Sequence, residues 1–279
     1  MDQMLEDYGV TIVDFNEGST VSYPQGHTAK EFFLAKPVQE TDALINLCKM
    51  KTHALERVTG GVKNLYGCIS GLHKAKGHTQ YTNADIFARQ LIDLNQLIAP
   101  RFCVMDGIVA MDGNGPTSGD PVKMNVLLLG NDPVAIDSVY CHLVHLDPQM
   151  VPTNVHGETM GLGTWREENI RLLSEDGEIT MQEAVERFGN PDFNVDRKKQ
   201  RSNLWNRFNN GFLRYFQKKP YIVTDKCKKC GVCVEACPVE GKALQFKNGR
   251  KQPPVYNYHK CIRCFCCQEM CPHKAIQVK

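Results

Sequence analysis

The chain has 279 residues, of which 42% are hydrophobic and 23% charged, and its formal net charge is +2. This composition excludes a disordered polyelectrolyte, and the length allows one large domain or a medium domain with a small one. The first twenty residues lack the basic stretch of a signal peptide, and no run of about 18 apolar residues occurs, so we expect a cytoplasmic protein without a membrane span.

Strand-like and helix-like segments alternate through the first two thirds of the chain. Apolar, β-rich runs predict strands at 10–15, 43–51, 101–111 and 125–132. Capping signals predict helices that begin after Asn83, after Asp132 and at the Thr180–Glu183 capping box. Alternating strands and helices predict an α/β fold with a mostly parallel sheet.

A basic segment follows the second predicted strand. Lys49, Lys51, His53 and Lys63 surround the Gly60–Gly61 pair. Cations beside a glycine-rich turn at the end of a strand suit an anionic ligand, either a phosphate or a carboxylate. A solvated basic loop is the alternative.

An acidic segment follows the third predicted strand. Asp106 and Asp112 each precede a glycine, and residues 114–116 read Asn-Gly-Pro, which is typical of a turn. The two aspartates are candidates for binding a metal, for acting as a general base, or simply for building turns. Asp132 is interpreted as a helix cap.

Residues 190–219 form a basic, asparagine-rich connection. Trp205, Phe208, Phe212 and Tyr215 recur there at helical spacing, so we expect a linker helix that lays its aromatic face on one of the domains. A helix that binds a membrane surface or a nucleic acid is the alternative.

Nine of the thirteen cysteines lie after residue 226. Two runs there have the spacing C-x2-C-x2-C-x3-C-P, which is typical of two-cluster bacterial ferredoxins, whose fourth cysteine ligates the cluster of the other run. The predicted ligands of the first [4Fe–4S] cluster are Cys227, Cys230, Cys233 and Cys271. The predicted ligands of the second are Cys261, Cys264, Cys267 and Cys237.

Zinc is the main alternative for such thiols, but zinc sites usually have two CxxC pairs separated by a longer gap. Cys266 is the spare cysteine of the second run, and we expect it to pack as a small residue. The four cysteines before residue 226 are expected to be buried in apolar surroundings. These are Cys48, Cys68, Cys103 and Cys141.

The tail is basic and the remainder acidic. Residues 218–279 carry 13 Lys and Arg against 4 Asp and Glu, whereas the whole chain is only +2. Opposite charges predict that the basic tail docks on the acidic domain, with a strength that falls as salt is added.

Four motifs together resemble the iron–sulfur proteins that carry domain of unknown function 362 (DUF362). They are KMKTH…TGGVKNLYG, MDGIVAMDGNGPTSG, NDPVAIDSV and the tail CIRCFCCQEMCP. The resemblance implies a C-terminal two-cluster ferredoxin domain and members mostly from anaerobes, with no settled reaction. The positions that match the family's pattern are Lys49, Lys51, His53, Lys63, Asn64, Asp106, Gly113 and Gly115. Family members usually have a further N-terminal α/β portion, so this chain is expected to begin late in the domain.

We therefore expect an α/β domain over residues 1–189, a basic linker over 190–219 and a ferredoxin domain over 220–279. The predicted function is electron transfer through two [4Fe–4S] clusters to an anionic substrate, with Lys49, Lys51, His53, Lys63 and Asp106 as catalytic candidates. A non-catalytic electron carrier or a redox sensor is the alternative, which leaves enzymatic activity open. Expected partners are a redox protein or a small anion, and no nucleic acid.

Overall fold

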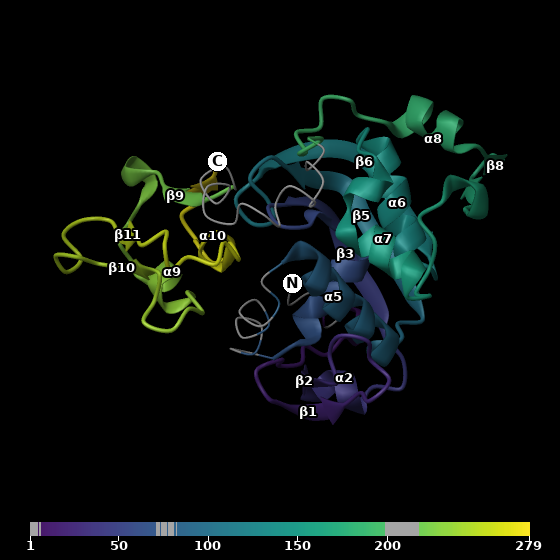
Figure 1. Cartoon of the computed structure of the whole chain (residues 1–279). Coiled ribbons are helices and arrows are strands. Elements are labelled where there is room, and N and C mark those ends of the chain that lie inside the picture. Colours follow the sequence, from purple (N-terminus) through teal and green to yellow (C-terminus); the bar gives the residue numbers. More distant parts are fainter. Residues whose placement is uncertain are drawn as a thin grey trace, which may run out of the picture.

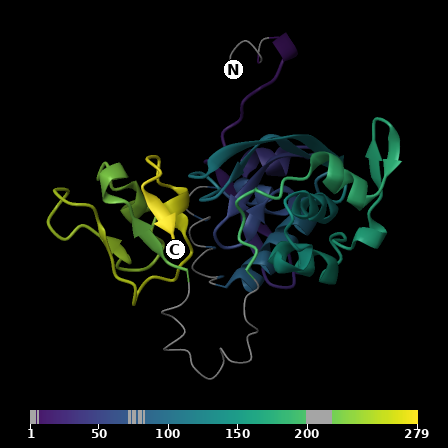
Figure 2. The same ribbon diagram turned by 90° about the horizontal axis from the view of Figure 1, so that it is seen from above.

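The computed structural model describes residues 5, 7–70, 73, 77, 81, 83–198 and 218–279. Figure 1 shows an α/β part and, beside it, a small C-terminal module in green to yellow. Figure 2 shows the same two parts from above. The expected linker helix with its four aromatic residues lies outside the described residues.

The main sheet has four strands in the order β4–β3–β5–β6. Their bounds are Arg57–Thr59, Ile45–His53, Phe102–Asp112 and Asp120–Gly130. Only β3 and β5 pair in parallel, while β3–β4 and β5–β6 are antiparallel. The prediction of a mostly parallel sheet was therefore wrong. A parallel return needs a long crossover, and only the short loop 113–119 joins β5 to β6, so β6 must run back antiparallel.

Two of the predicted strands, 43–51 and 101–111, correspond closely to β3 and β5. The fourth, 125–132, lies partly within β6, which begins earlier, at Asp120. The first was wrong, because residues 10–15 form no strand and Ile12 is 64% exposed. An apolar run becomes a strand only where a neighbouring strand pairs with it.

Two hairpins complete the strands of the α/β part, and the sequence analysis missed both. One consists of β1 (Gly18–Ser22) and β2 (Glu31–Ala35), and the other of β7 (Leu172–Ser174) and β8 (Gly177–Ile179).

The three predicted helix starts are confirmed. Asn83 caps α5 (Ala84–Ile98) by accepting from Asp85 N at 2.7 Å. Asp132 caps α6 (Pro133–Leu143), and Thr180 forms the capping box of α8 (Met181–Phe188). The other α-helices described here are α2 (Lys36–Glu40), α3 (Gly61–Asn64) and α7 (Pro152–Thr159). Single 3₁₀ turns span Leu65–Cys68, Pro148–Met150, Glu167–Asn169 and Thr224–Lys226.

The helices cover one face of the sheet. Side chains that alternate along β3 and β5, such as Met50 and Met105, form one core cluster with α6 and α8. A second cluster joins α5 to β2 and α3. The four scattered cysteines are buried, as predicted. The other face of the sheet carries exposed apolar side chains, including Leu47 and Leu129.

The C-terminal module is built from two similar halves. Each half is a cysteine loop followed by a one-turn helix, α9 (Val232–Glu235) or α10 (Cys266–Glu269). Antiparallel pairs β9–β12 and β10–β11 hold the halves together. The bounds of these strands are Pro220–Ile222, Ile276–Val278, Leu244–Gln245 and Val255–Tyr256. In Figure 1, α10 lies on the side of the module that faces the α/β part.

Candidate iron–sulfur and anion sites

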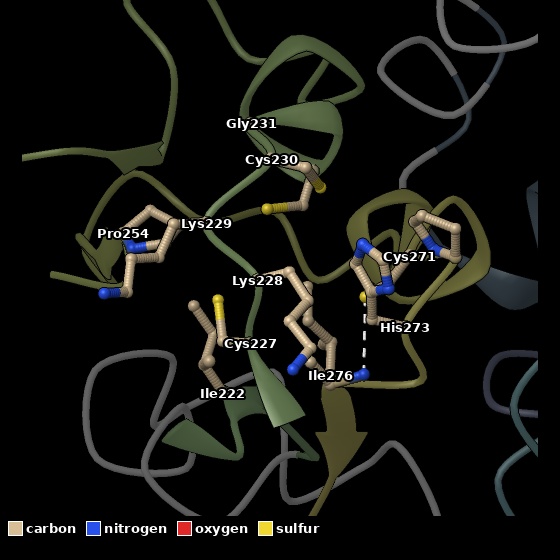
Figure 3. Close-up of a pocket in the computed structure, with 13 residues that line it drawn as sticks. Ile222, Cys227, Lys228, Lys229, Cys230, Gly231, Pro254, Cys271, His273 and Ile276 are labelled. Carbon is tan, nitrogen blue, oxygen red and sulfur yellow. Dashed lines mark hydrogen bonds between the residues drawn. The ribbon is translucent and has the colours of Figure 1, made fainter. Parts of the chain in front are cut away.

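The eight predicted cluster cysteines line two hollows in the C-terminal module. Cys227, Cys230, Cys233 and Cys271 line a hollow of about 340 Å³, shown in Figure 3. The second hollow, of about 310 Å³, contains the other predicted set, which is Cys237, Cys261, Cys264 and Cys267. In each hollow, three thiols come from one sequence run and the fourth from the other. This is the crossed arrangement that the spacing predicted.

Both cysteine loops turn tightly at equivalent positions. Lys229 (φ 57°) and Gly231 (φ 93°) are left-handed in the first loop, as Arg263 (φ 60°) and Phe265 (φ 60°) are in the second. Left-handed backbone is costly for residues other than glycine, so three of these four turns persist only because the surrounding structure holds them.

The donors around the thiols fit a [4Fe–4S] cluster. The backbone N–H of Ala243 donates to Cys237 Sγ at 3.3 Å, and that of Ala275 donates to Cys271 Sγ at 3.3 Å. The Tyr256 hydroxyl lies 3.1 Å from Cys267 Sγ. Hydrogen bonds to the thiolates stabilise the anionic ligand set. Zinc sites usually combine two CxxC pairs separated by a longer gap, whereas each set here takes three thiols from one tight run and the fourth from the other.

The spare cysteine, Cys266, is buried in α10 but lines neither of these two hollows. Its thiol lies beside that of Cys264, and this contact, together with burial, raises the pKa of Cys266. It is therefore a packed thiol next to the ligands.

The module docks on the α/β part through α10 and the loop between β5 and β6. Gln268 Nε2 donates to the carbonyl oxygens of Asn114 and Gly115, each at 2.9 Å. Asn114 Nδ2 donates to Ile276 O at 2.9 Å, and Thr117 Oγ1 donates to Glu269 O at 2.8 Å. The Asn-Gly-Pro turn thus binds the module, a role that sequence analysis missed because the partners lie more than 150 residues away.

This loop is anchored in turn on β3 and on the start of the linker. Gly115 N donates to Thr52 Oγ1 at 3.2 Å, and a Cβ at Gly115 would lie 2.3 Å from Thr52 O. Asp112 accepts from Asn194 N at 2.8 Å. The position of Gly115 therefore has no room for a side chain. The Asp112 carboxylate acts as a hydrogen-bond acceptor for the backbone N–H of Asn194.

Replacing Gly115 with alanine is expected to push the loop off β3 and to break the Gln268 contacts. Loss of a buried network typically costs about 2 kcal/mol or more, which corresponds to a fall of roughly 4 to 8 °C in the melting midpoint of a protein this size. Gly67→Ala is the control, because a Cβ there meets nothing within 4 Å. Anaerobic thermal unfolding measures both variants, and equal midpoints would contradict the role of Gly115.

His53, one of the predicted site residues, links the two parts directly. Its Nδ1 accepts the backbone N–H groups of Leu55 and Glu56, both at 3.1 Å, so the ring proton is on Nε2. Nε2 lies 2.8 Å from Glu269 Oε1 in α10 and donates to it. Burial, together with nearby Lys63, lowers the pKa of His53. A neutral imidazole therefore joins the end of β3 to the second cysteine run.

In this contact the acidic and basic groups come from the opposite partners to those that we predicted. We expected basic groups of the tail to meet acidic groups of the α/β part, but here the tail contributes Glu269 and the α/β part contributes His53 and the nearby Lys63. Lys274 Nζ donates only to a carbonyl, that of Gly119, at 3.2 Å. An ion pair between Lys218 and Asp196 joins the two ends of the linker, residues 190–219, and not the tail to residues 1–189. The other contacts depend on hydrogen-bond geometry more than on net charge.

Lys51 and Lys63 form a group of cations near His53. Lys63 is only 9% exposed, and its Nζ lies 6.0 Å from the centres of the Tyr66 and Phe87 rings. Burial lowers the pKa of Lys51, as do the neighbouring charges of Lys49 and Lys63. Among the described residues, no carboxylate forms an ion pair with Lys51 or Lys63. An anion bound between them would relieve their repulsion.

Lys49 and Asp106 are paired with each other. Lys49 Nζ lies 2.5 Å from Asp106 Oδ2, and both side chains are about 40% exposed. The hydrogen bond from Lys49 lowers the pKa of Asp106, although burial opposes this shift. A general base works best with a pKa near the working pH, so this geometry favours an ion pair over proton transfer.

The glycine-rich turn is already occupied by an internal carboxylate. Asp137 of α6 accepts from Gly61 N at 2.6 Å and from Val62 N at 3.1 Å. Burial raises the pKa of Asp137 to about 7, although these two hydrogen bonds oppose the shift. These two N–H groups are therefore not available to an external anion, and the predicted anion site, which stays a prediction, rests on the lysine side chains.

A buried carboxyl group lies near these lysines. Glu56 is fully buried, and in the part of the chain that the structure describes neither of its oxygens has a hydrogen-bond partner. Burial raises its pKa to about 8, although the charge of Lys63 opposes this shift. The sequence gives no signal for it, because Glu56 reads as an ordinary turn residue.

Comparisons with known proteins agree with this architecture. Residues 1–142 match the model of the domain of unknown function (DUF362), and residues 219–272 match that of the 4Fe–4S dicluster domain. Thylakoid-associated protein sll1697 of Synechocystis sp. is 31% identical over 226 residues, which cover 80% of this chain and 68% of that protein. No solved structure matches. The chain belongs to the DUF362 family and carries a C-terminal 4Fe–4S dicluster domain.

The iron–sulfur class follows from the dicluster domain. None of the helices in the described ranges is long and apolar enough to cross a membrane.

Proposed function

We propose that this protein accepts electrons on two [4Fe–4S] clusters and delivers them to a small anionic substrate held by Lys51 and Lys63. Cys227, Cys230, Cys233 and Cys271 would hold one cluster. Cys237, Cys261, Cys264 and Cys267 would hold the other. The clusters supply single low-potential electrons, and the α/β part, residues 1–189, supplies the substrate site.

The observation that carries the proposal is the hydrogen bond between His53 and Glu269. It joins the strand that carries Lys51 to α10, which contains Cys267 and ends two residues before Cys271. This contact supports the proposal because a predicted cluster ligand, Cys267, and a candidate lysine, Lys51, belong to the two elements that it joins. A carrier that only exchanges electrons with other proteins would not need a buried Lys63 and a half-buried Lys51 there.

His53 has a positioning role in this proposal. Its neutral ring holds α10 against the end of β3, since Nδ1 is fixed by two backbone N–H groups and Nε2 by Glu269. Lys51 and Lys63 attract and orient the anion. Lys49 and Asp106 hold β3 to β5 beside them.

Changing both Lys51 and Lys63 to methionine is expected to weaken anion binding at least tenfold, because the change removes two partly desolvated positive charges at nearly constant volume. Inorganic phosphate serves as the probe, and its binding is measured by isothermal titration calorimetry on the anaerobically purified protein. Iron content should stay unchanged in this variant.

Lys123→Met is the control, since Lys123 is an exposed lysine on β6. Equal phosphate binding by the wild-type protein and the double variant, with intact clusters, would contradict the substrate site and favour the electron-carrier function.

A further inference from the structure

The first hollow is accessible to solvent at one of its thiols. Of its four cysteines, Cys230 is exposed and Cys227 half-buried, whereas Cys233 and Cys271 are buried. Lys228, Lys229 and His273 also line this hollow (Figure 3). The thiols nearest to solvent therefore lie among basic side chains.

Further basic groups extend this rim. Arg250 lies over the first cysteine loop, since a Cβ on Gly231 would lie 3.0 Å from Arg250 Nη2. Lys229 Nζ donates to Lys251 O at 3.0 Å, which ties the two segments together. We define the basic rim as Lys226, Lys228, Lys229, Arg250, Lys251 and His273.

Two acids, Asp225 and Glu235, accompany the rim in the same segments, so basic groups dominate it. Basic side chains that only balance the negative charge of the thiolates do not need to lie at the surface. Lys226, Lys228, Arg250 and Lys251 are all exposed, and exposed charges act mainly on molecules that approach from solvent.

The contact with the α/β part leaves most of the basic rim exposed. α10 and Ile276 already contact the α/β part through the loop 113–119. The rim around Cys230 has no such cover among the described residues. The module thus contacts the α/β part through α10 and Ile276, while the exposed Cys230 and the basic side chains beside it remain available to a second protein.

We propose that the basic rim is the docking surface for an acidic protein that donates electrons, such as a flavin-containing carrier. This inference rests on the proposed function and names the partner class for it. On each encounter the reduced flavin loses one electron and the iron–sulfur module gains it, and no bond or proton needs to move. Opposite charge at the rim would speed encounter and orient the partner's flavin toward Cys230.

The test measures the dissociation constant of the anaerobically purified protein for a flavodoxin, an acidic flavin carrier, by analytical ultracentrifugation. Changing Lys228 and Arg250 to glutamate is expected to weaken binding at least tenfold in about 50 mM salt. Binding of the wild-type protein should weaken at least tenfold between about 50 and 300 mM salt, since exposed charges are screened.

The matched control changes Arg101 and Lys123 to glutamate, which alters the net charge equally on exposed residues of the α/β part. It should change the dissociation constant less than twofold. Equal weakening by both variants, binding that does not depend on salt, or no binding of flavodoxin by the wild-type protein would each overturn the docking surface.

Dithionite, a small reductant, separates this inference from the proposed function. If dithionite bleaches the cluster absorbance of all variants alike while the rim variant binds flavodoxin normally, the docking surface fails and the proposed function stands. If dithionite does not reduce the wild-type protein, the electron-transfer function itself fails.

Discussion

Replacing Cys267 with alanine is expected to remove about half of the protein's iron, whereas the same change at the adjacent Cys266 is expected to remove none. Cys267 lines the second hollow with Cys237, Cys261 and Cys264, and Cys266 lines neither of the two hollows. Both thiols are buried in α10, so the pair is matched in burial and helix position. Only the predicted ligand role differs between them.

Iron and acid-labile sulfide are measured on protein purified without oxygen. Cys237→Ala adds a test of the crossed arrangement. Although Cys237 belongs to the first cysteine run, its loss should deplete the same cluster as Cys267→Ala, so the double variant should lose no more iron than either single one. Iron loss in Cys266→Ala as large as in Cys267→Ala would contradict the assignment.

Changing Glu56 to glutamine is expected to flatten the pH dependence of stability above about pH 4.5. The pKa of Glu56 is about 8 in the folded protein, against 4.5 as the ordinary value. Between these two pH values the folded chain binds a proton that the unfolded chain has released, so stability falls as pH rises. The slope is about 1.4 kcal/mol per pH unit, and the loss reaches roughly 3 kcal/mol by pH 7. Glutamine cannot ionise and removes this loss.

The measurement compares melting midpoints at pH 5, 6, 7 and 8 under anaerobic conditions. Slopes are compared instead of absolute midpoints, because a buried glutamine amide brings its own desolvation cost. Glu175→Gln, at an exposed position between β7 and β8, should leave the pH profile unchanged. Parallel profiles for the wild-type protein and Glu56→Gln would show that Glu56 is ionised when folded. Asp137, whose pKa is raised to about 7, contributes to the same decline in both proteins.

Much of the local structure follows from short stretches of sequence. The capping residues Asn83, Asp132 and Thr180 begin helices where expected, because a cap depends on backbone groups two or three residues away. The crossed cysteine sets follow from spacing for a similar reason, since a cysteine every three residues confines each loop to one arrangement.

The direction of β6 and the absence of a strand at residues 10–15 could not be predicted from local sequence. Both depend on which strand is available for pairing, and hydrophobic pattern does not encode that choice. Tertiary contacts also gave the residues of the basic segment different partners. Lys49 pairs with Asp106, Asp137 takes the amides of the glycine-rich turn, and Lys51 and Lys63 remain near the module.

The sequence by itself therefore determined the iron–sulfur class, the eight candidate ligands and the starts of three helices, because these depend on residues close together in the chain. Only the tertiary structure decided what the family motifs do. The Asn-Gly-Pro turn and His53 hold α10 through partners more than 150 residues away. Folding buried Glu56 with no hydrogen-bond partner among the described residues, and it brought Lys51 and Lys63 close enough to repel each other. Such effects depend on desolvation and on contacts between distant segments, which arise only when the chain folds.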